Sequence, residues 1–366
     1  MKVLVTGGAG FLGSHVAEEC LRAGDEVVVF DDLSTGRAAN VPEGARLVRG
    51  SVADAAAVDA LFGAHRFGVV YHLAAYPAEV LSHHVRRFNY VNNVVGSANV
   101  INAAVRSAVG HFVYASSVAV YGGARGAQPE TAHATPRDPY GIGKLAVELD
   151  LAAAADLFKL SYTVLRPHNI YGERQHLADP YRNVVGIFMN QVFEGRPMTV
   201  FGDGSQTRAF TYVGDVAPLF VRAAREPGAR NQTFNVGSGA SHTVLEVALE
   251  VAAALGVEPR IERLAVRHEA LHVEAEHAKQ DRVFGPCDRT PLKEGIPRTA
   301  AWARDAWPLP RPRLPEIELD VALPPSWRPP EPRDPGDGPV PAKGALGVGG
   351  GGAPRPAAQQ AVKHPA

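Results

Sequence analysis

A tyrosine and a lysine four residues apart are this chain's clearest candidates for acid–base chemistry. Tyr140 and Lys144 stand at the two ends of the run YGIGK, and positions i and i+4 of a helix share one face. A free tyrosine has a pKa of about 10, too high for a base at neutral pH, but a nearby cation favours the phenolate. The pair alone is also common on solvated helix faces. Ser117 favours a site, because it ends the preceding apolar segment and could hold a sugar or carbonyl oxygen in the same cleft.

A glycine-rich loop near the N-terminus predicts a binding site for a dinucleotide. Gly8, Gly10 and Gly13 fit the pattern G-x-G-x-x-G, and Gly7, Gly10 and Gly13 fit G-x-x-G-x-x-G. Glycines in this pattern allow a tight turn, a close approach of the backbone to a pyrophosphate and close helix–strand contact. A helix expected at 11–23 follows the loop, and its N-terminus favours phosphate through free N–H groups and the helix dipole.

A carboxylate at the end of the next expected strand selects the kind of dinucleotide. Residues 26–30 are typical of a strand, and Asp31 follows at about 20 residues from the glycine loop. A carboxylate there accepts the hydroxyl groups of the adenine ribose and repels an extra 2′-phosphate. We therefore expect NAD rather than NADP as the cofactor.

Strand-like and helix-like segments alternate through the first half of the chain. The apolar run VVYHL is of the kind found in buried parallel strands. Repeated β–α units imply a parallel sheet with helices on both faces, and ligands bind at the carboxyl ends of its strands. We expect further strands at 45–48, 69–73, 111–115, 161–165 and 232–236, and helices at 54–62, 80–107, 140–157 and 244–255.

Changes of composition divide the chain into three expected parts. A doubly wound parallel (Rossmann) α/β domain is expected at 1–165. A smaller mixed α/β substrate lobe is expected at 166–307, where loops lengthen and some segments return to the sheet. Proline, glycine and alanine dominate 308–366, and such a segment buries too little apolar surface to offset the entropy of ordering. We predict a disordered C-terminal tail there.

The overall composition excludes several classes of protein. The 37 basic residues nearly balance the 38 acidic ones, so no global field favours nucleic acid or an anionic membrane. Cys20 and Cys287 suggest no disulfide framework, and His268, His272 and His277 lack the context of a metal site, so no metal is expected. No apolar run reaches the ~20 residues that cross a bilayer. The first strand begins too early for an N-terminal signal, so we expect a cytoplasmic protein.

The motifs occur in an order typical of one family. TGGAGFLG, Asp31, VYASSVAVYGG, PYGIGK and RPHNIYG resemble, in order and spacing, the extended short-chain dehydrogenase/reductase family, in its NAD-dependent nucleotide-sugar epimerase/dehydratase branch. The resemblance covers about residues 1–305 and implies a catalytic triad of Ser117, Tyr140 and Lys144. Tyr140 would act on the proton of the sugar 4-hydroxyl, and Lys144 would also hold the nicotinamide ribose.

The resemblance implies further contacts to the cofactor. Ser51 and Val52 stand where the family usually has Asp-Ile or Asp-Val against the adenine, so one adenine contact is weakened. Asn93 matches an asparagine near the catalytic pocket. The expected cofactor contacts are Gly7, Gly10, Phe11, Leu12, Gly13, Asp31, Ser51, Val52, Leu73, Ala74, Ala75, Asn93, Tyr140 and Lys144.

Substrate contacts are expected from the second lobe as well as from Ser117 and Tyr140. Asn169, in RPHN, and Arg208, in GDGSQTRAF, resemble family residues directed at the diphosphate of a nucleotide sugar. Arg267 resembles a second such arginine. A guanidinium suits this task because it can pair two phosphate oxygens at once.

Ala119 separates the reactions of this branch. The resembling dehydratases and decarboxylases carry a glutamate at this position, and the 3,5-epimerases carry a cysteine; alanine can transfer no proton. In the resembling enzymes, loss of the O4 proton and of a hydride from C4 gives a 4-keto sugar. Without a second acid–base group, this intermediate has one simple fate, which is reduction from its other face. We expect an NAD-dependent 4-epimerase of a UDP-sugar, with UDP-glucose/UDP-galactose as the leading pair.

Three alternatives stay open. UDP-glucuronate is a second candidate substrate, since SQTRAF and RPHNIYGERQ also occur in relatives that handle uronates. A nucleotide-sugar decarboxylase or dehydratase would need an unrecognised base, and an NAD-sensing regulator would commonly have lost the tyrosine or lysine. The family usually dimerises through two long helices, here 80–107 and 140–157, so the resemblance implies a homodimer.

Overall fold

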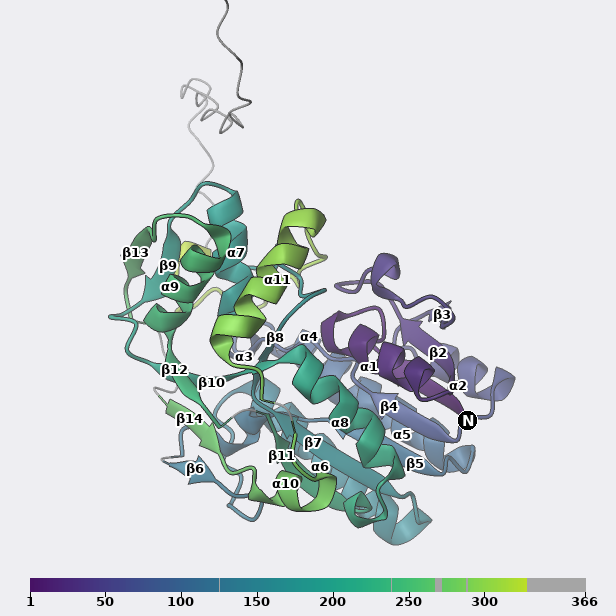
Figure 1. Cartoon of the computed structure of the whole chain (residues 1–366). Coiled ribbons are helices and arrows are strands. Elements are labelled where there is room, and N and C mark those ends of the chain that lie inside the picture. The colour runs from purple at the N-terminus through teal and green to yellow at the C-terminus, as the bar shows by residue number, and fades with distance from the viewer. Residues whose placement is uncertain (125, 238, 267–271, 288, 328–366) are drawn as a thin grey trace, which may run out of the picture. The chain divides into compact units, whose positions relative to one another are not determined.

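Seven parallel strands form the central sheet, in the order β11-β7-β5-β4-β1-β2-β3 (Figure 1). The computed structural model describes residues 1–327 except 125, 238, 267–271 and 288. The inner strands are runs of buried valine and aromatic residues, which suit a sheet covered on both faces. The strands are β1 Lys2–Thr6, β2 Glu26–Asp31, β3 Arg46–Arg49, β4 Val69–His72, β5 His111–Ala115, β7 Tyr162–Pro167 and β11 Gln232–Val236.

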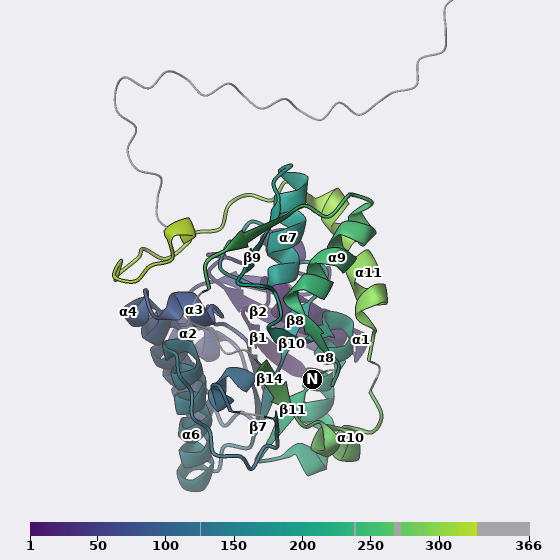
Figure 2. The ribbon, with the colours of Figure 1, turned by 90° about the vertical axis from the view of Figure 1, so that its left-hand side faces the viewer.

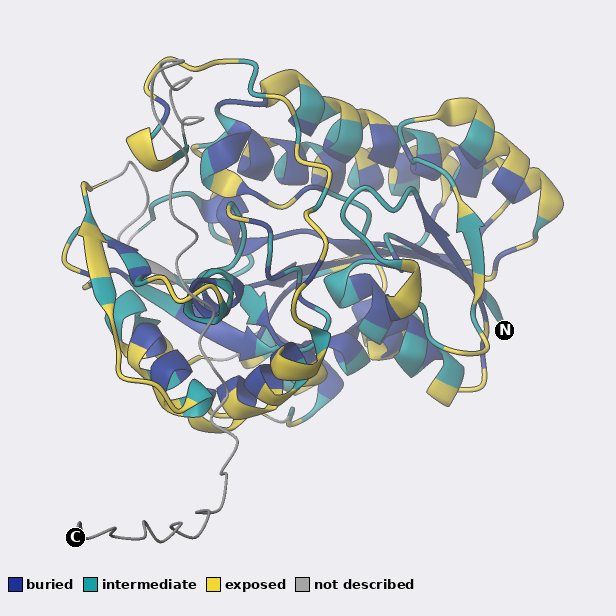
Figure 3. Ribbon diagram, turned by 90° about the horizontal axis from the view of Figure 1, so that it is seen from above, coloured by how far each residue is buried: buried dark blue, intermediate teal, exposed yellow. Residues whose placement is uncertain are grey.

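Helices cover both faces of this sheet, as the sequence predicts for a doubly wound fold. One apolar core joins α1 and α8 to the sheet, and another joins α2, α5 and α6 to the opposite face. Figure 3 shows the buried sides of these helices turned toward the strands. The helices are α1 Phe11–Arg22, α8 Val213–Arg225, α10 Ala278–Phe284, α2 Ala55–Ala64, α5 Gly96–Arg106 and α6 Pro139–Phe158.

The helix predicted at 80–107 is divided into several pieces. α3 (Glu79–Ser82) ends before His83, and α4 (Arg86–Tyr90) continues through the π-helical turn η2 (Val91–Val95) into α5. Val85, the residue before α4, makes no side-chain hydrogen bond that caps this helix. The stretch is helical over most of the expected range, but it breaks between Ser82 and Arg86, and its central turn is wider than an α-helical turn. Such π-turns are frequent at functional sites.

The second lobe is a smaller mixed structure around its own apolar core. Figure 2 shows α7, α9 and α11 grouped beyond β8 and β10. β11 leaves this part of the chain and pairs with β7 in the central sheet. The elements are β6 Ala127–Gln128, β8 Asn169–Tyr171, β10 Thr207–Tyr212, β12 Ser241–Thr243 and β14 His272–Ala275 in one sheet, β9 Met198–Phe201 with β13 Ile261–Leu264, and the helices α7 Val184–Phe193, α9 Val244–Leu255 and α11 Leu292–Ala306.

The folded chain continues past the boundary expected after residue 307. Met1–Leu323 form one compact unit, and a second unit begins at Pro324. Leu309 and Leu323 are buried, and Arg313 N–H donates to the carbonyl of Ser34 at 3.0 Å. The prediction of a disordered tail is therefore wrong for residues 308–323, because apolar burial and backbone hydrogen bonds hold them. Residues 328–366 lie outside the described part of the chain.

Candidate active site

The glycine loop after β1 is packed so closely that side chains are excluded. A Cβ added to Gly13 would lie 2.1 Å from the carbonyl oxygen of Gly7, and one added to Gly7 would lie 2.8 Å from the Cα of Ala74. Gly7 also has a φ of +70°, which favours glycine. α1 starts at Phe11 without a side-chain cap from Gly10. Its first-turn N–H groups, including that of Leu12, suit a pyrophosphate.

Asp31 is held rigidly beside this loop at the end of β2. Its Oδ2 accepts from the N–H of Ala9 at 3.0 Å, and its Oδ1 accepts from the N–H of Leu33 at 2.8 Å. Burial raises the pKa of Asp31, although these two backbone hydrogen bonds oppose the shift. A fixed carboxylate at this edge of the sheet suits the hydroxyl groups of a ribose.

We call the glycine loop, Asp31 and the facing segment 73–75 the cofactor cradle, because Ala74 packs against Gly7. A chain of hydrogen bonds that could not be predicted from the sequence supports the segment 73–75, which is the opposite wall of this cradle. The N–H groups of Leu73 and Ala74 both donate to Thr6 Oγ1, at 3.2 and 3.3 Å. Thr6 Oγ1 also bonds His72 Nδ1 at 2.7 Å, and His72 Nε2 bonds Ser97 Oγ at 2.8 Å. Burial lowers the pKa of His72 to about 3, so its ring is neutral. These residues fix the backbone on which Ala74 meets the glycine loop.

Asn93 lies in the π-helical turn and uses its side chain to fix the backbone after Ala75. Its Oδ1 accepts from the N–H of Tyr76 at 2.9 Å, and its Nδ2 donates to the carbonyl of Tyr76 at 3.2 Å. Asn89, one turn earlier, accepts from Asn93 Nδ2 and donates to the carbonyl of Pro139 at 2.9 Å. In this structure Asn93 therefore positions the cofactor wall relative to α6.

Ser51 and Val52 follow β3 at the edge of the cradle. Ser51 Oγ accepts from the N–H of Ala53 at 3.3 Å, so it closes a local turn. Val52 is buried, and its carbonyl accepts from Asn99 Nδ2 at 2.9 Å. The apolar side chain of Val52 lies against Gly96, the first residue of α5.

Tyr140 is placed by the N-terminus of α6. Asp138 caps this helix, because its Oδ1 accepts from the N–H of Gly141 at 2.8 Å. The N–H of Tyr140 donates to Ser82 Oγ at 3.1 Å, which ties α6 to α3. Ser117, two residues past the end of β5, lies close enough to the Tyr140 phenol to lower its pKa, and its Oγ accepts from the N–H of Ala119 at 3.1 Å. The structure thus brings the predicted serine and tyrosine together.

Lys144 completes the group one turn further along α6. Its Nζ lies 5.7 Å from the ring centre of Tyr140 and donates to the carbonyl of Ala115 at 2.6 Å. Burial lowers the pKa of Lys144 to about 7, and the same burial raises the pKa of Tyr140. The Ser117 side chain offsets this rise of the phenol pKa only in part. A phenolate here therefore needs positive charge in addition to that of Lys144.

A buried ion pair that the sequence analysis did not identify lies next to the triad. Arg166, near the end of β7, donates from Nε to Glu148 of α6 at 2.9 Å, and Ser116 Oγ donates to the same carboxylate. Arg166 also donates to the hydroxyl of Tyr121 at 2.7 Å, which donates in turn to Asn235 at 2.8 Å. This network joins α6, β7 and β11 below the catalytic residues.

The predicted substrate residues lie in the second lobe, beyond the carboxyl end of β7. Asn169 begins β8 and pairs in register with Phe210 of β10. Arg208 lies earlier on β10, half-buried, and its Nη1 donates to the carbonyl of Thr207 at 2.8 Å. Arg267 lies outside the described residues.

His168 is a buried residue of this region that the predicted site set leaves out. It follows β7 directly and packs on His277 with ring centres 4.9 Å apart. Among the described residues, neither ring nitrogen of His168 has a hydrogen-bonding partner. Burial lowers the pKa of His168 to about 3, so the ring is neutral.

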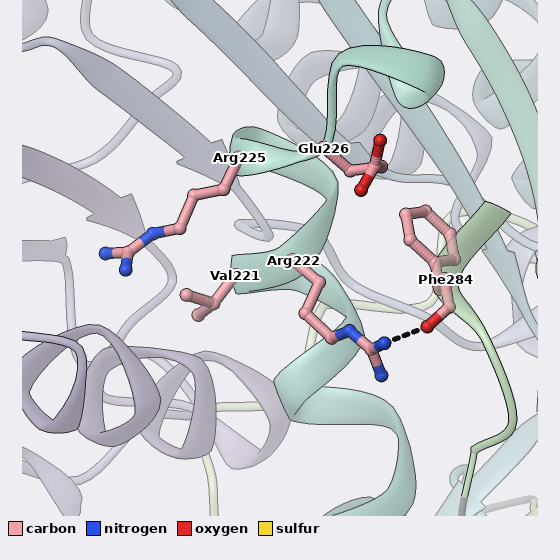
Figure 4. A pocket seen from close by; sticks show the side chains of 5 residues that line it. All are labelled: Val221, Arg222, Arg225, Glu226 and Phe284. Carbon is pink, nitrogen blue, oxygen red and sulfur yellow. Dashed lines mark hydrogen bonds between the residues drawn. The ribbon is translucent and has the colours of Figure 1, made fainter.

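A separate pocket lies between α8 and α10 (Figure 4). Arg222 donates to the carbonyl of Phe284, and Arg225 forms an ion pair with Asp25 at 2.6 Å. None of its lining residues belongs to the predicted site. Within the described residues no cluster of three metal-ligating side chains occurs, and no helix is long and apolar enough to cross a membrane.

Comparison with known proteins defines the class of enzyme to which this site belongs. Residues 3–237 match the model of the NAD dependent epimerase/dehydratase family, and the chain belongs to that family. UDP-glucose 4-epimerase of Mycolicibacterium smegmatis is 35% identical over 318 residues, which cover 83% of this chain and 99% of that protein.

Solved structures agree with this assignment. The UDP-glucose 4-epimerase of Thermus thermophilus in complex with NAD has a TM-score of 0.79 and 33% identity, covering 84% of this chain and all of that one. MoeE5 in complex with UDP-glucuronic acid and NAD has a TM-score of 0.75 and 32% identity over 84% of this chain. The cofactor of the family is NAD, and the side-chain-free approach at Gly13 and the fixed carboxylate of Asp31 fit it.

Proposed function

We propose that this protein is an NAD-dependent 4-epimerase of a UDP-sugar, with UDP-glucose and UDP-galactose as the leading pair. The observation that carries the proposal is the composition of the site next to Ser117. Tyr140 supplies an acid–base group, whereas the buried Ala119, two residues past Ser117, has no group that could move a proton at C5 or C6 of a hexose. The similarity to UDP-glucose 4-epimerases supports the choice of sugar.

Tyr140 is the acid–base group on which this proposal depends, and the alanine at position 119 supplies no second one. When bound, NAD supplies a hydride acceptor and a positive charge near the phenol. Tyr140 takes the proton from the sugar O4 as hydride leaves C4, and Ser117 donates a hydrogen bond to the resulting 4-keto oxygen. Lys144 holds positive charge close to the phenolate. Once the 4-keto sugar has turned its other face to the bound cofactor and regained the hydride at C4, Tyr140 would return its proton to O4, and the product would be the 4-epimer.

Product analysis tests this proposal directly. The purified protein is incubated separately with UDP-glucose, UDP-glucuronate and UDP-N-acetylglucosamine without added NAD, and the products are followed by proton NMR. We expect UDP-galactose to form fastest. Release of CO2 or a 4-keto-6-deoxy product would contradict the 4-epimerase proposal. Absence of turnover with all three substrates would favour an NAD-sensing regulator.

UDP-glucuronate is the second candidate substrate. The specific observation in its favour is the similarity to MoeE5, whose structure contains UDP-glucuronic acid and NAD. A carboxylate at C6 in place of a hydroxymethyl group leaves the chemistry at C4 unchanged. Faster conversion of UDP-glucuronate to UDP-galacturonate in the same experiment would therefore change the substrate assignment and keep the reaction.

We also propose a homodimer formed through the helical segment η2–α5 and through α6. Val91 and Val95 expose their side chains one turn apart, and Ile142 and Leu149 do so two turns apart on the neighbouring helix, with Leu149 63% exposed. Apolar stripes on two adjacent helices suit a two-fold four-helix contact with a second copy. Sedimentation should show a dimer that Leu149→Glu dissociates. The control Leu249→Glu, at an exposed position of α9, should leave it intact.

A further inference from the structure

The chain beyond α11 runs from the second lobe to the cofactor side along residues 308–323, which we call the C-terminal strap. Directly before the strap, Trp307 packs on Phe193 of α7 with ring centres 5.5 Å apart. Midway, Arg313 N–H donates to the carbonyl of Ser34 at 3.0 Å, in the loop that follows Asp31. Figure 2 shows the strap as the yellow-green chain that then lies beside α3 and α4.

The far part of the strap is bonded to the N-terminus of α4. The carbonyl of His84 accepts from the N–H groups of Glu318 and Leu319, at 2.8 and 3.1 Å. The Glu318 carboxylate accepts from the N–H groups of Arg87 and Phe88, each at 2.8 Å. Since Val85 gives α4 no side-chain cap, Glu318 supplies the missing cap and a negative charge at the positive end of the helix.

We call the hydrogen bonds of Glu318 to the N-terminus of α4 the α4 anchor. Packed side chains link this anchor to the backbone that follows Ala75, at the inner wall of the cradle. The Phe88 ring packs edge-on against Tyr76 at 5.5 Å, and Tyr76 directly follows Ala75, with its backbone fixed by Asn93. The other anchor, Ser34, lies three residues beyond Asp31. The strap therefore bonds the loop at the ribose side directly and reaches the inner wall through the contact of Phe88 with Tyr76.

A second bridge of the same kind comes from the substrate lobe. Arg182 lies over the ring of Tyr76 at 4.9 Å, and its Nη2 donates to Thr35 Oγ1 at 3.2 Å. Asp179 holds the guanidinium through its Nε at 2.9 Å. Arg182 and the strap thus tie together the same two borders from different parts of the chain.

We propose that the C-terminal strap is a clamp that retains NAD. It ties the loop after Asp31 to the N-terminus of α4 across the cofactor cradle, so NAD leaves only when the strap detaches. The value of retention rests on the proposed function: an epimerase that lost its reduced cofactor in mid-reaction would strand a 4-keto sugar. Retention of NAD by the clamp does not require a sugar substrate.

Two truncations test the clamp in the NAD-loaded protein. One chain ends at Trp307 and lacks the strap, and its matched control ends at Trp327 and keeps it. The dissociation rate of NAD is measured by exchange against excess labelled NAD, without any sugar. We expect the chain ending at Trp307 to release NAD about tenfold faster than full-length protein, and the control to match it. Equal rates in both truncations would overturn the proposal.

A point substitution tests the α4 anchor in a chain of full length. Glu318→Gln removes the capping charge, and we expect about threefold faster release of NAD. Glu316→Gln is the matched control, because Glu316 is an exposed carboxylate of the strap. Identical rates in the two variants would contradict the clamp. The exchange measurement needs no turnover, so a failed epimerase assay would leave this result intact.

Discussion

The two sides of the cleft differ in how their buried polar side chains are satisfied. On the cofactor side, Thr6 and Ser97 each bond one ring nitrogen of His72, so both nitrogens of this imidazole are paired. On the substrate side, both ring nitrogens of His168 and the Nε2 of His277 are buried without a hydrogen-bonding partner among the described residues. Gln175 Oε1 and His176 Nδ1, in the loop after β8, share that state.

This difference separates a preorganised surface from one that a ligand completes. A buried polar group left unpaired costs about 1–3 kcal/mol, so most such groups in folded proteins are bonded. On the cofactor side the His72 imidazole has met that requirement within the protein, although the hydroxyl of Tyr76 on the same side has no partner among the described residues. The substrate side carries an unmet one, which a hydroxyl-rich ligand or ordered water can satisfy. Substitutions on the two sides should therefore have opposite effects on stability and binding.

The largest expected effect comes from a change that leaves both surfaces in place. Tyr140→Phe removes one hydroxyl, and we expect kcat to fall about a thousandfold because the acid–base group is lost. NAD binding should change little, since Tyr140 is not part of the glycine loop or of the carboxylate site. Turnover by NMR and NAD titration by calorimetry measure both. Substantial residual turnover would contradict the proposed mechanism.

A second change attacks the preorganised side. Asp31→Asn removes the charged acceptor, and we expect NAD affinity to fall about ten- to hundredfold. Discrimination against NADP should weaken too, because the charge that repels a 2′-phosphate is gone. Fluorescence titration with both dinucleotides measures the two constants. An unchanged preference for NAD would show that another residue selects the cofactor.

The same carboxylate predicts a pH dependence of binding. We expect the ionised form of Asp31 to accept the ribose hydroxyl groups, so NAD affinity should be full above the pKa of Asp31 and be lost as pH falls through it. Burial raises that pKa above the ordinary value of aspartate, so weakening should begin at a higher pH than an exposed aspartate would give. NAD titrations of the wild type and Asp31→Asn across the acidic range check this, and the variant should lack the transition.

A smaller effect compares a bonded imidazole with an unbonded one. His72→Leu leaves Thr6 and Ser97 without their partner, and we expect it to destabilise the protein by about 1–3 kcal/mol. His168→Leu removes unpaired buried nitrogens, and we expect a gain of about 1 kcal/mol together with a severalfold higher KM for the UDP-sugar. Denaturant unfolding and initial rates measure these changes. Equal destabilisation by both substitutions would remove the contrast between the two sides.

Local features of the sequence predicted the parts of this molecule that depend on near neighbours. β5 and β11 lie at the predicted residues, because short apolar runs between turn residues define buried strands. The glycine loop was likewise predictable, since each glycine meets backbone within a few residues or across one parallel strand. The cofactor followed from that loop and Asp31.

Long-range pairings were beyond the reach of the sequence. Glu148 and Arg166 form their ion pair only because α6 packs beside β7, and neither residue has a local pattern that marks it. Glu318 caps a helix more than two hundred positions earlier. Its proline-rich surroundings favoured disorder, since composition alone does not reveal a partner for backbone hydrogen bonds. The break near His84 escaped detection for the same reason.

The order of the chain gives the strap one more consequence, which concerns biosynthesis. Residues 308–323 leave the ribosome after the glycine loop, Asp31, α4 and the catalytic helix have all emerged. Domains commonly fold as they are made, from the N-terminal end. A cradle without its closure therefore exists for a time on every nascent chain, and during that interval NAD can bind before the last segment folds across it.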